Sequence, residues 1–157
     1  IEPAASIADF AIKKQTATAT ILQGTDVTLP GTAITARLKN CYRVSLFVCT
    51  LGAALLEKMQ YFLDEGELTK ATIMDAVGSE AVEALAEKVH EIIRQHARAD
   101  GAAVTVRFSP GYADWPLAEQ GKLLPLLHTE EIGVSLTESF LMIPEKSITA
   151  CVGWKKS

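Results

Sequence analysis

One short stretch of the sequence combines residue types that often bind small ligands. Arg107 leaves a segment with strand character and meets the turn Ser109-Pro110-Gly111-Tyr112, and Trp115 and Pro116 follow closely. Loops that leave the end of a rigid strand often carry ligand-binding residues. The stretch therefore predicts a ligand-binding loop. The alternative is a tight turn whose aromatic residues cap the core and whose arginine makes a surface ion pair.

Motifs for other kinds of chemistry are absent from the sequence. It contains no nucleophile elbow, no glycine-rich phosphate loop and no HExxH zinc motif, and no pair of carboxylates has a spacing that would place it around a substrate. His90, His96 and His128 have no ligand spacing with a cysteine or carboxylate, so no tightly bound metal is expected. We predict no catalytic acid, base or nucleophile in this chain.

The cysteines indicate a reducing compartment. Cys41, Cys49 and Cys151 are an odd number, and their spacing matches neither a zinc site nor a disulfide framework. This usage favours the cytoplasm. Cys49 lies within an apolar run, so we interpret it as a small buried thiol rather than a reactive one.

Three blocks of the sequence form a recognisable set. The first places Arg107, Gly111 and Tyr112 in an Arg-x-x-x-Gly-Tyr arrangement; the second runs from Leu136 to Pro144 and begins Leu-Thr-Glu-Ser-Phe. The third runs from Glu83 to Glu91 and reads Glu-Ala-Leu-Ala-Glu-Lys-Val-His-Glu. Together the blocks span about half of the chain. In their order along the chain, they resemble the activation domain of cobalamin-dependent methionine synthase, the module that binds S-adenosylmethionine.

This resemblance implies a site for the methionyl end of S-adenosylmethionine. It implies that Arg107 binds the carboxylate and that Glu83 binds the ammonium group. A guanidinium suits the first role because it holds a carboxylate through two parallel charge-assisted hydrogen bonds. For Glu83, the alternative is a solvated helix face.

The resemblance also implies contacts to the rest of the ligand. The ring of Tyr112 is expected beside the adenosine or the sulfonium, because an aromatic face attracts a cation. The backbone from Tyr112 to Asp114 is expected at the adenine edge, although Ala113 stands where the family has proline. Glu138 and Ser139 match the family as well and either bind the ligand or support the turn. The expected S-adenosylmethionine-binding residues are Glu83, Arg107, Gly111, Tyr112, Ala113, Asp114, Glu138 and Ser139.

The family's other modules are absent, which limits the implied function. The chain has no Asp-x-His-x-x-Gly loop for cobalt and no homocysteine or folate module, so it resembles a stand-alone activation subunit. The resemblance implies an accessory protein of methionine biosynthesis that supplies S-adenosylmethionine for reductive remethylation of cobalamin on a separate methionine synthase chain. A flavodoxin- or ferredoxin-like electron donor is implied as a further partner. The alternatives are a binding or sensing module for another corrinoid methyltransferase and a non-catalytic structural subunit.

The elements that position these residues alternate without a regular βαβ order. We predict strands in 103–108, 134–137 and 147–152, with 42–50 as a central strand, and two short strands or one bent strand over 16–22 and 26–29. Helices are predicted in 32–39, 53–63, 68–99 and 116–127. The helix over 68–99 is interrupted at Gly78-Ser79, which predicts two helices or one kinked helix, with Ser79 as a possible N-cap. The result is an α+β fold with a mostly antiparallel twisted sheet. We expect a single domain over residues 1–157, with 1–15 as a weak short helix or a terminal arm.

The predicted helix over 68–99 carries two adjoining stripes in its second half. Apolar residues recur there at the i, i+3, i+4, i+7 spacing of a buried helix face. The neighbouring stripe consists of Glu83, Glu87, His90, Glu91 and Arg94. Glu83 lies at the margin of the apolar stripe, so its side chain can point into a cleft while the helix packs on the sheet.

Composition argues against several classes of partner. The 157 residues are 48% apolar and 22% charged, which suits an ordinary globular domain. A net charge of -4 and the lack of a long basic run argue against nucleic acid. The longest uncharged stretch, 44–56, is too short for a helix that must cross a bilayer of about 30 Å. The sequence has no basic-then-apolar leader and opens on Ile1, so we expect a soluble chain that was processed or belongs to a longer one.

Overall fold

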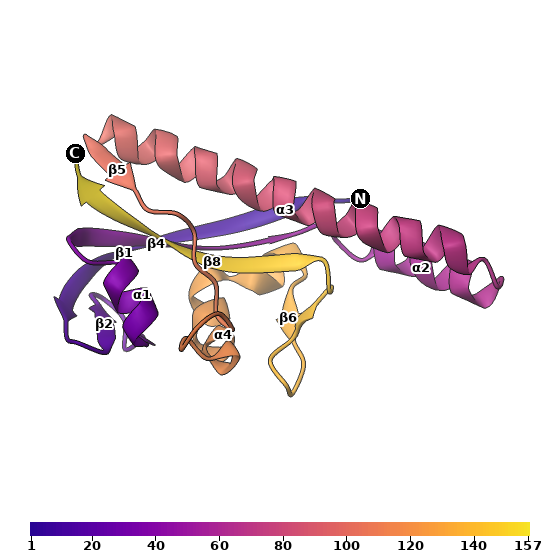
Figure 1. Cartoon of the computed structure of the whole chain (residues 1–157), viewed down its shortest axis with the longest axis horizontal. Coiled ribbons are helices and arrows are strands. Elements are labelled where there is room, and N and C mark those ends of the chain that lie inside the picture. The colour runs from indigo at the N-terminus through magenta and orange to yellow at the C-terminus, as the bar shows by residue number, and fades with distance from the viewer.

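The computed structural model describes residues 1–157 and shows an α+β fold built on a six-stranded sheet (Figure 1). The strand order is β3-β2-β1-β4-β8-β5, and every neighbouring pair is antiparallel. A separate two-stranded hairpin is formed by β6 (Ser135–Leu136) and β7 (Met142–Ile143). The predicted fold class is therefore confirmed. The strands of the main sheet are β1 (Ala4–Gln15), β2 (Ala19–Leu22), β3 (Thr28–Pro30), β4 (Cys41–Thr50), β5 (Ala102–Val104) and β8 (Ser147–Lys156).

Helices pack on both faces of the sheet. The long helix α3 (Leu68–Ala99) runs along one face, and α2 (Ala54–Asp64) pairs with its first half beyond the end of the sheet (Figure 1). The opposite face carries α1 (Thr32–Arg37) and α4 (Gln120–Leu123). Short 3₁₀ helices at Leu117–Glu119, Leu124–Leu127 and Thr129–Ile132 accompany α4. None of the helices combines the length and apolar character needed to cross a membrane.

Strand β4 is buried on both faces, as its apolar run, broken only by Ser45 between Val44 and Cys49, predicts. Val44, Leu46 and Val48 contribute to the core on the α1 and α4 side. Phe47 and Cys49 point to the other face and pack in the core under α3. The central position predicted for this segment is confirmed, because β4 lies between β1 and β8.

The expectation of a weak helix or a terminal arm over residues 1–15 is wrong. This segment is β1, which pairs with β4 from Ala4 opposite Thr50 to Ala11 opposite Arg43. Its burial alternates residue by residue, but alanine and polar residues occupy most positions and have little strand preference of their own. Pairing with β4, distant in sequence, therefore makes this segment a strand.

Of the two alternatives predicted for Gly78-Ser79, that of two separate helices is wrong, because α3 is one continuous helix of 32 residues. Ser79 is not an N-cap: its hydroxyl donates to the carbonyl of Asp75 at 3.0 Å and accepts from Nζ of Lys146 at 2.9 Å. Gly78 is buried, and a Cβ there would lie 2.5 Å from Cδ2 of Leu55 in α2. The glycine therefore marks a close approach of two helices rather than a helix end.

Replacing Gly78 by alanine should lower the free energy of unfolding by about 1 kcal/mol. In an open helix the same change stabilises by about 1 kcal/mol, but here the added methyl must displace the buried Leu55, and overpacking costs about 1–3 kcal/mol. Urea denaturation measures the difference. The control is Ala76→Gly at an exposed position of α3, which should destabilise by about 1 kcal/mol through propensity alone. A stabilised Gly78→Ala variant contradicts the proposed close packing.

The other predicted elements are present with changed bounds. The strands over 16–22 and 26–29 and the helices over 32–39 and 53–63 are confirmed as β2, β3, α1 and α2. The strand over 103–108 is shorter than predicted, because β5 ends at Val104 and only a single bridge joins Phe108 to Cys151. The helix over 116–127 is a series of short helical turns, and β7 was not predicted.

Candidate functional site

A cavity of about 1160 Å³ opens where the edge of the main sheet is uncovered. Strand β5 pairs with β8 over three residues only, and the bridge at Phe108 is the last contact of this kind. Beyond it, Ser147, Ile148 and Thr149 of β8 have no strand partner on that side and form one wall of the cavity. The remaining walls come from α3, the segment that follows β5, and the β6–β7 hairpin.

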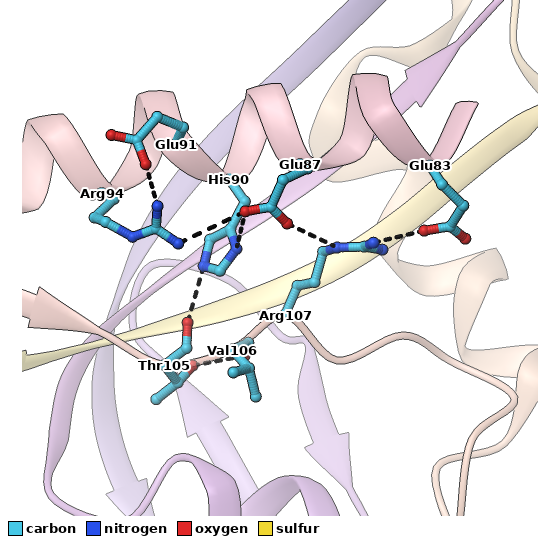
Figure 2. A network of polar contacts seen from close by, with 8 residues as sticks. All are labelled: Glu83, Glu87, His90, Glu91, Arg94, Thr105, Val106 and Arg107. Atoms are coloured by element: carbon cyan, nitrogen blue, oxygen red, sulfur yellow. Dashed lines mark hydrogen bonds and ion pairs between the residues drawn. The ribbon is translucent and has the colours of Figure 1, made fainter. Parts of the chain in front are cut away.

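The two residues expected to bind the amino-acid end of the ligand are in direct contact at this cavity (Figure 2). Nη2 of Arg107 donates a hydrogen bond to Oε2 of Glu83 at 2.5 Å. The side chain of Arg107 is 25% exposed and that of Glu83 is 57% exposed, so the pair is accessible from solvent. Arg107 thus makes the ion pair of the alternative interpretation, but it does so on a cavity wall and with the glutamate that the resemblance indicates.

The charged stripe predicted on α3 forms a connected network around this pair (Figure 2). Oε2 of Glu87 lies 4.0 Å from Nε of Arg107, and Oε1 of Glu87 lies 3.7 Å from Nη2 of Arg94. Arg94 also pairs with Glu91. His90 is buried, and its Nε2 lies 2.9 Å from the carbonyl oxygen of Thr105. Because a carbonyl oxygen only accepts, Nε2 of His90 must carry a proton.

The turn after Arg107 is closed by Trp115. Gly111 has a φ of +92°, which glycine adopts easily, and its N–H donates to the carbonyl of Trp115 at 2.8 Å. The Trp115 ring is fully buried and stacks on Phe108 with a centroid distance of 5.8 Å and an interplanar angle of 4°. Tyr112 lines the cavity and is 67% exposed. The alternative interpretation of a core-capping aromatic is thus confirmed for Trp115 but not for Tyr112.

The next two residues, Ala113 and Asp114, do not line the cavity. Ala113 has a φ of +51°, which a proline ring cannot adopt, so the family's proline would not fit this conformation. The carboxylate of Asp114 accepts hydrogen bonds from the N–H and hydroxyl of Thr32, both at 2.6 Å, and from the N–H of Ala33 at 3.0 Å. Asp114 therefore caps the N-terminus of α1. Of the backbone expected at the adenine edge, Tyr112 is the residue that lines the cavity.

Glu138 and Ser139 lie at the exposed tip of the β6–β7 hairpin, outside the cavity lining. The hydroxyl of Ser139 is 3.1 Å from that of Thr137, and Thr137 lines the cavity. Thr137 also closes the hairpin, since its N–H donates to the carbonyl of Leu141 at 2.8 Å. This geometry favours the turn-supporting role for Ser139.

Asp114 should make the stability of the protein depend on acid pH. Hydrogen bonds, first that from the Thr32 hydroxyl and then those from the backbone, lower the pKa of Asp114 from 3.8 to about 2. A lowered folded-state pKa stabilises the fold above the unfolded value, and this contribution disappears as the pH falls through the folded value. Asp114→Asn should therefore have a lower Tm than wild type at neutral pH, by a margin that shrinks between about pH 4 and pH 2. Thermal unfolding checks this; a margin that stays constant over that range contradicts it.

Gln120 and Thr149 are among the cavity-lining residues that were not predicted from the sequence. Gln120 is buried, and its Oε1 accepts from the Thr149 hydroxyl at 2.5 Å while its Nε2 donates to the Phe140 carbonyl at 2.7 Å. It therefore ties α4 to β8 and to the hairpin at the cavity. No signal in a single sequence points to this pairing, because the partners are 20 and 29 residues away.

The cysteines take no part in this chemistry. Burial raises the pKa of Cys49 to about 11, and a backbone hydrogen bond with Ile148 only partly offsets it. The thiol therefore stays protonated at neutral pH, as the interpretation of a buried, unreactive cysteine requires. Cys41 and Cys151 are also buried and free.

The fold and the site together are those of an antiparallel α+β domain with a charged cavity at the sheet edge. The family model described as vitamin B12 dependent methionine synthase, activation domain, matches residues 2–157. The chain therefore belongs to this family.

A comparison with solved structures points to the same fold. The chain is similar to a crystal structure described as the MetH reactivation domain bound to AdoHcy, with a TM-score of 0.74 at 17% sequence identity. The match covers 96% of this chain and 58% of the other, so this chain spans less than two thirds of its neighbour's length. At this identity the similarity establishes the fold.

Proposed function

We propose that this chain binds S-adenosylmethionine in the sheet-edge cavity and supplies it for remethylation of a cobalamin held on a separate methionine synthase chain. Family membership and the AdoHcy named for the structural neighbour support this proposal. The observation that carries it is the pair of Arg107 and Glu83, which come from distant segments and meet at the cavity wall.

The ion pair is complementary to the zwitterionic end of an amino acid. A ligand carboxylate can replace Glu83 on the guanidinium, and the ligand ammonium can then engage the released Glu83 carboxylate, so one ion pair is exchanged for two. Arg107 and the two glutamates next to it, Glu83 and Glu87, together carry one excess negative charge (Figure 2). A sulfonium ligand with one net positive charge suits this balance.

The chain's own residues need only bind, orient and shield the ligand. S-adenosylmethionine already carries its leaving group, so methyl transfer requires no acid or base from this chain, in accord with the lack of a catalytic motif. A corrinoid held by the partner chain would supply the nucleophile, and a flavodoxin- or ferredoxin-like donor would supply the electron that reduces it. Apolar residues of the cavity, Phe108, Leu141 and Ile148 among them, exclude water from the bound ligand. The proposed setting is the cytoplasm, where free thiols persist.

Calorimetric titration of the whole chain with S-adenosylmethionine and with S-adenosylhomocysteine tests the binding step. We expect micromolar binding of both, and weaker binding of 5′-methylthioadenosine, which lacks the amino-acid end. A chain that gives no heat with either ligand contradicts the proposal and favours a structural subunit.

A reactivation assay tests the second step. A methionine synthase that lacks its own activation module and holds oxidised cobalamin should regain activity with a reductant, S-adenosylmethionine and this chain, and not when the chain is omitted. Binding without reactivation would point instead to a module that serves another corrinoid protein.

A further inference from the structure

Helix α3 presents two glutamates to Arg107, and their surroundings differ (Figure 2). Glu83 has one charged partner, the guanidinium of Arg107. Glu87, one helical turn further along, lies between two guanidinium groups, that of Arg107 at 4.0 Å and that of Arg94 at 3.7 Å. Glu83 can therefore turn to a ligand by giving up one contact, whereas Glu87 stays attracted to two arginines.

The backbone that carries Arg107 is fixed on both sides. The carbonyl of Thr105 accepts from Nε2 of His90 at 2.9 Å, which fastens the segment to α3. The N–H of Thr105 donates to the carbonyl of Gly153, and its hydroxyl accepts from the N–H of Gly153, both at 2.9 Å. Phe108 then pairs with Cys151. With the backbone fixed, the direction of the guanidinium depends on the carboxylates next to it.

Those carboxylates contact different nitrogens of Arg107. The carboxylate of Glu83 pairs with Nη2, whereas that of Glu87 lies nearest to Nε. Under the proposed function, the ligand ammonium draws Glu83 away from the guanidinium. The 4.0 Å approach of Glu87 is an ion pair longer than a hydrogen bond, and it can shorten once Glu83 no longer holds the guanidinium at Nη2.

We infer that Glu87 is a positioning residue, which holds the Nε side of Arg107 so that the guanidinium stays aimed at the ligand carboxylate after Glu83 has turned to the ligand ammonium. This inference rests on the proposed function for its ligand. Glu83 and Glu87 then have separate tasks: Glu83 recognises the amine, and Glu87 acts only through Arg107, on the carboxylate. The alternative is a structural role in which Glu87 only stabilises α3 through its ion pair with Arg94.

Three ligands separate these roles in titrations of the whole chain. They are S-adenosylhomocysteine, its analogue without the α-amino group, and 5′-methylthioadenosine, which has neither amine nor carboxylate. Glu83→Gln should lower the affinity for S-adenosylhomocysteine about tenfold and leave the affinity for the analogue without the amine unchanged. Glu87→Gln should lower the affinity for both carboxylate ligands by the same factor, about three- to tenfold, and leave the affinity for 5′-methylthioadenosine unchanged.

Glu91→Gln is the matched control, because Glu91 lies on the same helix and pairs with Arg94 but has no contact with Arg107. It should bind all three ligands like wild type. Wild-type affinities in Glu87→Gln overturn the inference. An equal loss for 5′-methylthioadenosine also overturns it, because that result shows a structural role.

A measurement without ligand keeps the inference testable if the wild-type chain binds none of these molecules. In ¹⁵N NMR spectra, the Nε–H signal of Arg107 should remain sharp in Glu83→Gln, where Glu87 is the remaining carboxylate beside it. The signal should broaden in the double variant Glu83→Gln/Glu87→Gln and persist in Glu83→Gln/Glu91→Gln. A sharp signal in the first double variant contradicts the role of Glu87. A wild-type chain that binds no ligand, with the expected NMR result, contradicts the proposed function alone.

Discussion

Arg107→Ala should lower the affinity for S-adenosylmethionine by about a hundredfold or more. Two charge-assisted hydrogen bonds to the ligand carboxylate are lost, each worth about 1.5–3 kcal/mol, and Glu83 is left without its cationic partner. Arg107→Lys should retain part of the affinity, because an ammonium group keeps the charge but not the planar fork. Titration calorimetry of the three proteins measures the effect.

The control for this prediction is Arg43→Ala. Arg43 is another arginine in an ion pair, with Asp100 at 3.3 Å, and it does not line the cavity. Its removal should leave the affinity unchanged. If Arg107→Ala binds S-adenosylmethionine as wild type does, the carboxylate is held elsewhere and the proposed site is wrong.

Trp115→Ala should destabilise the protein by about 3–5 kcal/mol, because the residue is fully buried and no neighbour can fill the space of an indole. The same change removes the stacking on Phe108, which follows Arg107 directly, so ligand affinity should fall as well. Guanidinium chloride denaturation gives the free energy of unfolding, and titration of the folded variant gives its affinity for S-adenosylmethionine.

Trp115→Phe is the matched variant. It keeps an aromatic ring on Phe108 and removes the indole N–H, which is buried without a hydrogen-bond partner. Because a buried unpaired donor itself costs about 1–3 kcal/mol, the loss of stability should be well below that of alanine. Equal losses for the two variants would show that ring stacking contributes little here.

Several elements could be predicted because their signals are local. A half-buried strand alternates apolar and polar residues, whereas β4 has apolar residues on both of its faces, and this pattern indicates a central strand. The charged stripe on α3 follows from helical spacing alone, and the network around Glu87 lies where that spacing places it. The link between Arg107 and Glu83 is different, because it came from a resemblance to a family and not from periodicity.

Other features depend on segments that are far apart in the chain. β1 carries a weak pattern of alanines and polar residues, and its pairing with β4 makes it a strand. Asp114 reads as a loop residue, yet it caps a helix that lies 82 residues earlier in the sequence. Gly78 suggests a helix break in the sequence, whereas it is a contact point with Leu55.

The amino-acid sequence was therefore sufficient for the α+β class and most helix and strand positions, and its resemblance to a family singled out the arginine and the glutamate that meet at the cavity. Spacing along one chain segment carries the information on helices and strands, because their side chains repeat at a constant angle. The cavity arises from a non-local event: β5 stops at Val104 and leaves part of the β8 edge open beside α3. Which glutamate meets which nitrogen of Arg107 depends on how α3 packs over that edge, and packing between distant segments leaves no periodic signal in a sequence.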